Sequence, residues 1–136
     1  MTRFAPQIRP VDMDEAVAVG IAFPLTVGNS YQNYTTAKQV HDNLKNLLLT
    51  MPGERIYYPT FGSNLYRLLF EPMNDEEMIP AATNAVETAV EEWMPFVEIS
   101  QVRIISKIDE QKVKVIVNYK INGWPAPNVL NMDVKV

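Results

Sequence analysis

The pattern of hydrophobic positions changes its period partway along the chain. Before Pro95, apolar residues recur every three or four positions, as they do at Val40, Leu44 and Leu47, and this spacing predicts helices. After Pro95 they alternate with polar residues, which predicts half-buried antiparallel strands. We therefore expect an α+β domain in which three helices pack on a small antiparallel sheet formed mainly by the C-terminal strands.

The first two helices are bounded by recognisable signals. The first is expected over 36–50, where Thr36 and Gln39 have the spacing of a capping box. The second is expected to be barely two turns long. It ends at Pro72, because proline disfavours helical geometry at the residue before it.

The start of the third helix is open in the sequence. Asn74 and Glu77 resemble a capping pair, which favours a start directly after Asn74. Pro80 is better accommodated in the first turn of a helix, which favours a start near Ile79. In both cases the helix is expected to end at Met94-Pro95.

The strands are expected mainly after these helices. The segment 97–105 alternates with a break that indicates a bulge near Ser100 and Gln101. Cleaner alternation predicts strands over 112–121 and 128–136. A further short strand is expected within 16–25, before a polar loop.

Length and composition narrow the class of protein. A chain of 136 residues gives one domain, so we expect 1–15 to form an N-terminal arm and 16–136 a single domain. The absence of Cys excludes disulfides and a thiolate nucleophile, and the single His41 excludes a His-rich zinc site. The first twenty residues lack the apolar run of a signal peptide, and no stretch approaches the ~20 apolar residues of a spanning helix. We therefore expect a soluble cytoplasmic protein with no membrane partner.

The net charge of −4 hides an uneven distribution. Residues 71–100 contain eight acids and no base, whereas 101–136 are net positive. Nucleic-acid binding requires a concentrated basic face, so this layout favours internal neutralisation or a polar protein partner. We expect no nucleic-acid partner and no cofactor.

A pair of carboxylates is the best enzymatic candidate. Glycoside hydrolysis needs two acids ~5–9.5 Å apart, one of them in an apolar pocket. Glu71 follows three apolar residues, and Asp75 or Glu76 could complete the pair, but Pro72 breaks the helix that would align them. Acids near a helix N-terminus are also favourable without catalysis, and we favour that structural interpretation.

The remaining polar candidates are weaker. His41 lies at the margin of a helix face beside Asp42 and is interpreted as a solvated histidine. Ser63 and Thr50 lack the G-x-S-x-G elbow of a nucleophile. A further candidate is a group of tyrosines at Tyr31, Tyr34, Tyr57 and Tyr58. Such residues lie at the edge of a core or in an interface more often than they form a sugar-binding platform.

Four segments occur in an order and spacing that resemble a known family. They are GIAFPL at 20–25, LLLTMPGER at 47–55, PTFGSNL at 59–65 and LFEP at 69–72. Together they resemble the sheath-initiator or baseplate-wedge family of contractile-tailed bacteriophages. The related baseplate subunit of type VI secretion systems shares the pattern, and the resemblance covers about 16–136.

The resemblance implies a structural protein of the tail baseplate rather than an enzyme. The family also carries a lysozyme label, which the carboxylates above do not support. Its Glu-Pro-Arg motif, which grips the core bundle of the wedge, falls on Glu71 and Pro72. Met73 stands in the third position, so the contact is apolar or Arg67, one turn upstream, substitutes. The family motif loop comprises Pro52, Gly53, Glu54 and Arg55.

The resemblance also implies that the C-terminal sheet pairs with the tail sheath subunit and templates the first sheath ring. Terminal strands have edges that must be covered or used, which is compatible with such pairing. The expected pairing residues, on the strands 112–121 and 128–136, are Lys112, Lys114, Ile116, Asn118, Lys120, Leu130, Met132, Val134 and Val136.

The expected partners are the wedge core proteins and the sheath subunit. We expect a monomer in isolation, a six-fold arrangement in the baseplate, assembly in the host cytoplasm and a final location in the virion tail. Two alternatives belong to other classes. One is a peptidoglycan hydrolase of the baseplate that uses Glu71, and the other is a carbohydrate-binding module that uses the tyrosines.

Overall fold

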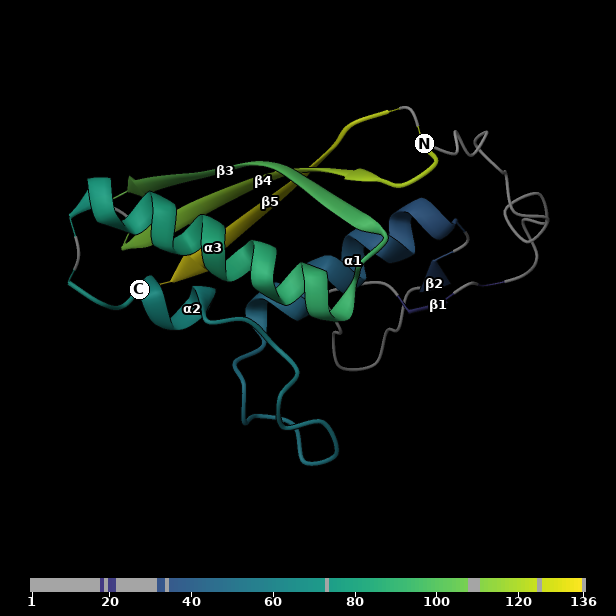
Figure 1. The fold of residues 1–136 in the computed structure, drawn as a ribbon, viewed down its shortest axis with the longest axis horizontal. Coiled ribbons are helices and arrows are strands. Elements are labelled where there is room, and N and C mark those ends of the chain that lie inside the picture. The colour runs from purple at the N-terminus through teal and green to yellow at the C-terminus, as the bar shows by residue number, and fades with distance from the viewer. Residues whose placement is uncertain are drawn as a thin grey trace.

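A computed structural model describes residues 18, 20–21, 32–33, 35–72, 74–107, 111–124 and 126–135. Three helices precede a three-stranded sheet in this part of the chain, as the change of period predicts (Figure 1). The helices are α1 (Thr36–Leu49), α2 (Leu65–Leu68) and α3 (Asp75–Trp93). The sheet is formed by β3 (Val97–Lys107), β4 (Lys112–Ile121) and β5 (Asn128–Lys135), and the α+β prediction is confirmed.

The fold has two layers. The helices cover one face of the sheet (Figure 1). The side chains of β4 alternate between buried and more exposed positions because of the strand period of two. The core between the layers contains Val40, Leu44, Leu47 and Leu48 from α1, Val86 and Val90 from α3, and Val115, Val117, Leu130 and Met132 from the sheet. The opposite face of the sheet, here called the open face, has no helix of the described chain over it.

Both strand pairings within the three-stranded sheet are antiparallel. β4 lies between β3 and β5, and Val117 is opposite Val102 on one side and Leu130 on the other. The register of β3 shifts between Ile99 and Gln101, which confirms the predicted bulge. The turn after β4 is closed by a hydrogen bond from the Trp124 N–H to the Ile121 carbonyl (3.0 Å), with Gly123 at φ 85. Glycine is the favoured residue at such a backbone angle.

The start of α1 differs from the predicted one by one residue, and the start of α3 is the earlier of the two that the sequence left open. Thr35, not Thr36, is the N-cap of α1, and its hydroxyl accepts from the Lys38 N–H (3.4 Å). Gln39 therefore has no role in a capping box, and its amide instead donates to Asn43 (2.7 Å). α3 begins directly after Asn74, although Pro80 lies inside the helix. The proline has no N–H to donate to the carbonyl of Glu76 one turn earlier.

The remaining elements are short. α2 has only four residues, fewer than the two turns expected, although a hydrogen bond from the Leu69 N–H to the Leu65 carbonyl (3.2 Å) extends the coil slightly. The strand expected within 16–25 is described only as β1 (Gly20–Ile21), which pairs with β2 (Gln32–Asn33). β2 was not predicted, because it falls in a polar loop with no apolar alternation. The expected arm over 1–15 lies outside the described residues.

Candidate protein-binding surfaces

The order of the strands determines which backbone groups can pair with a partner. β4 is hydrogen-bonded on both sides, so a partner strand cannot add to it, and the pairing expected for 112–121 cannot use its backbone. The outer strands are β3 and β5, and in the described chain no strand pairs with their outer edges. An outer strand directs about half of its N–H and C=O groups away from the sheet. In the described chain, β3 and β5 are therefore the strands of this sheet whose backbone is available to a further strand.

The predicted pairing side chains are divided between two faces. Leu130, Met132 and Val134 are buried under the helices, so they stabilise the sheet and do not contact a partner directly. The β4 residues Lys112, Lys114, Ile116, Asn118 and Lys120 lie on the open face with partial or full exposure. Val136 lies outside the described residues. A strand added beside β5 would therefore contact its backbone groups and its exposed side chains, not its buried side chains.

Charged residues of neighbouring strands are opposite one another on the open face, and two of these pairs join opposite charges, whereas Lys112 is opposite Lys135. Lys114 is opposite Asp133 and Lys120 is opposite Glu98, which are favourable pairs of opposite charge. Along β5 the open face presents the exposed residues Val129, Asn131, Asp133 and Lys135. These side chains alternate with the buried ones and are the positions that a neighbouring strand would meet.

The turn predicted to contact the wedge core is exposed and polar. Glu71 forms an ion pair with Arg67, with 3.7 Å between the Arg67 Nε and the Glu71 Oε1 atoms. The Arg67 side chain is 76% exposed and the Glu71 side chain is 40% exposed. Arg67 is thus one turn before Glu71 and on the same side of the chain. Pro72 is exposed, and Met73 lies outside the described residues.

The carboxylates near this turn do not share an enclosed pocket. The Glu71 carboxylate is open to solvent, and Glu76 is exposed on the first turn of α3. The side chain of Asp75 lies outside the described part of the chain. Neither described carboxylate has the apolar enclosure that a glycosidase acid requires.

The loop between α1 and α2 is held by hydrogen bonds at its base. The Ser63 N–H donates to the Thr50 carbonyl (2.9 Å), and the Gly53 N–H donates to the Pro59 carbonyl (2.6 Å). The Ser63 hydroxyl also donates to the Leu48 carbonyl (2.9 Å), and the Thr50 hydroxyl donates to the Asn46 carbonyl (2.6 Å). Both hydroxyls are therefore structural, which agrees with the absence of a nucleophile motif.

Aromatic contacts fix the same loop to α3. The Phe61 ring meets the Trp93 ring edge-on at 5.0 Å between centroids, and the Arg55 guanidinium lies 4.1 Å above the Phe61 ring. Tyr58 also approaches Trp93 edge-on at 6.4 Å. Beyond this contact the side chains of Ile56 and Tyr57 are 92% and 90% exposed. Of the four candidate tyrosines, Tyr31 and Tyr34 lie outside the described residues, so the structure gathers only Tyr57 and Tyr58.

His41 is not the solvated histidine that the sequence suggests. It is half-buried, and its Nδ1 lies 3.2 Å from the hydroxyl of the buried Tyr119. Burial lowers the pKa of His41 and raises the pKa of Tyr119 to about 12. The neighbouring Asp42 is also buried and accepts a hydrogen bond from the Asn33 amide (2.6 Å). This polar cluster joins α1 to β2 and β4, and no single position in the sequence marks it.

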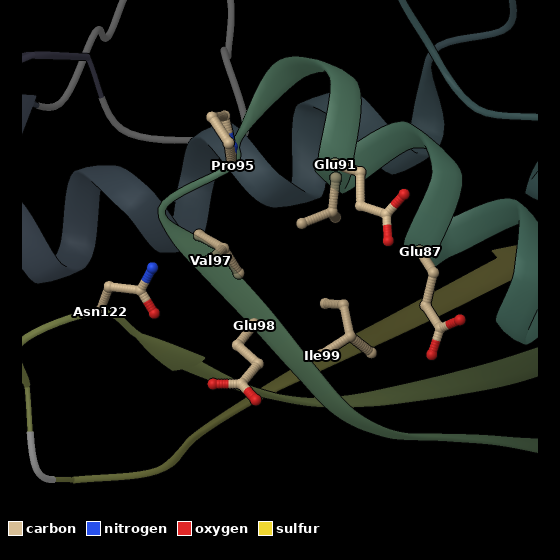
Figure 2. A pocket seen from close by; sticks show the side chains of 8 residues that line it. Glu87, Glu91, Pro95, Val97, Glu98, Ile99 and Asn122 are labelled. Carbon is tan, nitrogen blue, oxygen red and sulfur yellow. The ribbon is translucent and has the colours of Figure 1, made fainter. Parts of the chain in front are cut away.

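An acidic hollow lies where α3 leads into β3 (Figure 2). It has a volume of about 330 Å³. Its polar lining is Glu87, Glu91, Glu98 and Asn122, and its apolar lining is Val90, Pro95, Val97 and Ile99. No basic side chain lines it. Within the described ranges no cluster of three His, Cys, Asp or Glu could hold a metal ion, and no helix there is long and apolar enough to cross a membrane.

The comparisons with known proteins identify the class. The family model described as baseplate wedge protein gp25 matches residues 35–126, which is more than half of the chain. The chain therefore belongs to the baseplate wedge protein gp25 family, a family of structural baseplate proteins. The matched range includes all three helices together with β3 and β4. A search of curated proteins finds no match.

Three solved structures share the fold at low sequence identity. A Geobacter sulfurreducens protein named as a tail lysozyme has a TM-score of 0.66 and 18% identity, over 83% of this chain and 96% of its own. A chain in the baseplate of the anti-feeding prophage has a TM-score of 0.59 and 19% identity, over 76% and 85%. A chain in the postcontracted baseplate of pyocin R2 has a TM-score of 0.50 and 19% identity, over 85% and 98%. The lysozyme name brings no catalytic residue with it.

Proposed function

We propose that this chain is a non-enzymatic baseplate wedge component that joins the wedge core to the tail sheath and templates the first sheath ring. β5 is the strand that would pair with the sheath subunit. The observation that carries this proposal is an eight-residue outer strand, fixed on one side by β4 and with no described strand on the other. Such a strand is a ready template for β-augmentation.

The energetics favour repetition over a single tight contact. Each added backbone hydrogen bond is worth about 0.5–1.5 kcal/mol net, and an incoming strand also loses conformational entropy. One strand addition is therefore modest. Copies arranged with six-fold symmetry, as in the symmetrised anti-feeding prophage baseplate, would repeat it around a ring and give avidity without a strong individual interface.

The buried side of β5 explains why the template would hold its register. Leu130 is 0% exposed, Met132 is 1% exposed and Val134 is 4% exposed, so a shift of one residue would bring polar side chains into the core. β5 is thereby locked in place before any partner arrives. The outer backbone groups are presented at fixed positions, as a template requires.

The wedge contact belongs to the turn at the end of α2. Arg67 and Glu71 are paired, solvent-accessible and close to the exposed Pro72, so a polar partner could exchange with this ion pair. In the proposal this turn contacts the wedge core and β5 contacts the sheath. The isolated chain would be a monomer that assembles with its partners in the host cytoplasm and ends in the virion tail.

Adjacent proline substitutions test the strand pairing. Successive N–H groups of a strand point alternately toward its neighbour and outward, so only one of Asp133→Pro and Val134→Pro removes an outward donor. Thermal melting identifies that variant, because it keeps the β4–β5 ladder and melts close to the alanine variant of the same residue. We expect it to enter baseplates but to yield particles without sheath, whereas Asp133→Ala and Val134→Ala, as controls, assemble sheath. Normal sheath on the folded proline variant would refute pairing through β5.

A further inference from the structure

Lys135 faces a like charge at the outer edge of the sheet. It is exposed on the open face of β5 and lies directly opposite Lys112 of β4. Like charges in directly opposite positions destabilise a pair of strands. Within the described ranges, the Lys135 side chain forms no ion pair or hydrogen bond that offsets this repulsion. A neutral or acidic residue at position 135 would therefore suit the isolated sheet better.

The neighbouring charges make this end of the open face positive. Lys112 and Lys114 of β4 are half-exposed beside β5, and Asp133 is opposite Lys114. Asp133 thus already faces a base within the sheet, whereas Lys135 faces another lysine. A carboxylate on the outer side of Lys135 would be attracted by Lys135 itself and by the lysines of β4 behind it.

The charges of β5 can distinguish registers that burial cannot. If an added strand slips by one residue, its side chains exchange faces, but a slip of two residues leaves each side chain on its original face. On the open face of β5, Val129 and Asn131 are uncharged, whereas Asp133 and Lys135 carry opposite charges. A partner carboxylate opposite Lys135 would be repelled by Asp133 after a slip of two residues in that direction, and it would lose Lys135 after a slip in the other.

We propose that Lys135 selects the register of the sheath strand by pairing with a carboxylate of that strand. The occupant of this edge is the strand of the sheath subunit that adds to β5, with an Asp or Glu directly opposite Lys135 and no acid opposite Asp133. The backbone ladder attaches the strand, and the charge of Lys135 decides its alignment. This inference rests on the function proposed above and adds to it the chemistry of the partner strand.

Charge reversal tests the inference in cells that assemble the particle but lack the endogenous chain. The full-length chain is supplied as wild type, as Lys135→Glu, or as the control Arg103→Glu, which reverses an exposed base on the open face of the other outer strand, β3. The fraction of purified particles that carry sheath is counted by electron microscopy, and folding is measured by thermal melting. Lys135→Glu should melt at or above the wild-type temperature, because the new carboxylate faces Lys112.

We expect Lys135→Glu to lower the fraction of sheathed particles at least about tenfold, because the reversal acts at each copy around the ring. The control Arg103→Glu should assemble sheath normally. The acidic residues of the sheath subunit are then changed to Lys one at a time. One of these changes should restore sheath to the Lys135→Glu chain, and it identifies the carboxylate that Lys135 selects.

A lysine on an outer strand can also serve only to deter unwanted pairing, and glutamate, which is equally charged, would do so as well. Normal sheath on Lys135→Glu would therefore overturn the proposal, as would a loss that no change in the sheath subunit restores. The proline variants at Asp133 and Val134 separate this failure from that of the proposed function. If the folded proline variant lacks sheath while Lys135→Glu assembles it, β5 pairs with the sheath but Lys135 does not set the register. If both assemble sheath, the strand pairing is refuted as well.

Discussion

Gly62 and Gly53 allow the conformation of the loop after α1 to be tested by one matched pair of substitutions. Both glycines have positive φ, 133 for Gly62 and 97 for Gly53, so alanine is strained at either position. They differ in the space available. A Cβ atom at Gly62 would lie 2.4 Å from the Thr50 carbonyl oxygen, whereas a Cβ at Gly53 meets nothing within 4 Å.

The magnitudes follow from this difference. The backbone strain of an alanine at positive φ is about 1–2 kcal/mol, and Gly53→Ala should lose roughly that much stability. Gly62→Ala should lose the same amount and in addition about 1–3 kcal/mol for the displaced backbone, or about 2–5 kcal/mol in total. The displaced atom is the carbonyl oxygen that accepts from the Ser63 N–H, so this hydrogen bond is also weakened.

Urea unfolding followed by circular dichroism measures both losses. The slope of free energy against urea concentration should be unchanged in both variants, because the surface exposed on unfolding is the same. Gly62→Ala should unfold at clearly lower urea than Gly53→Ala. Equal losses, within about 0.5 kcal/mol, would show that the close approach of Gly62 to Thr50 does not constrain the loop.

Three further changes probe the core and the buried polar groups. Leu130→Ala should destabilise the domain by about 2–5 kcal/mol in urea, since Leu130 is 0% exposed; a loss below about 1 kcal/mol would argue against this core. Ser63→Ala leaves the Leu48 carbonyl without its donor and should cost about 1–3 kcal/mol, whereas an unchanged transition would mean that water replaces the hydroxyl. Burial lowers the pKa of His41 in the folded protein, so as pH drops below 6.5 the unfolded chain takes up a proton more readily than the folded one, and the melting temperature should fall. His41→Gln should reduce this dependence of melting temperature on pH. An unchanged dependence in that variant would mean that other groups cause it.

The fold was largely predictable because its signals are local and periodic. The alternation over 112–121 identifies β4 and its buried face, and a break in alternation identifies the bulge after Ile99. Helix α1 was predicted within one residue at its C-terminal end, since Met51-Pro52-Gly53 terminates it. The cap was displaced by one residue because Thr35 and Thr36 are equivalent in a pattern and only the backbone angle at Thr35 decides between them.

What could not be predicted depends on contacts between distant segments. The strand order places β4 in the centre, and neither composition nor period contains that information, so β4 and β5 were equal candidates for pairing. His41 looks solvated beside Asp42 in the sequence, but the fold brings Tyr119 to it from 78 positions away. Ile56 and Tyr57, in the loop after α1, are apolar residues that the sequence does not mark as exposed, and only the structure shows that they are 92% and 90% exposed.

Disulfide trapping tests the central claim, that β5 pairs with a strand of the sheath subunit. The chain contains no cysteine, so single cysteines can be placed on the open face of β5 at Asn131 and Asp133, with Arg103 on β3 as the comparison. Paired strands bring Cα atoms to about 4.5–5.5 Å, within the range of a disulfide. In particles with cysteines scanned along the sheath subunit, we predict crosslinks from β5 to alternate positions of one sheath strand, shifted by two residues between Asn131→Cys and Asp133→Cys. Crosslinks from Arg103→Cys alone, or none from β5 in sheathed particles, would contradict the account.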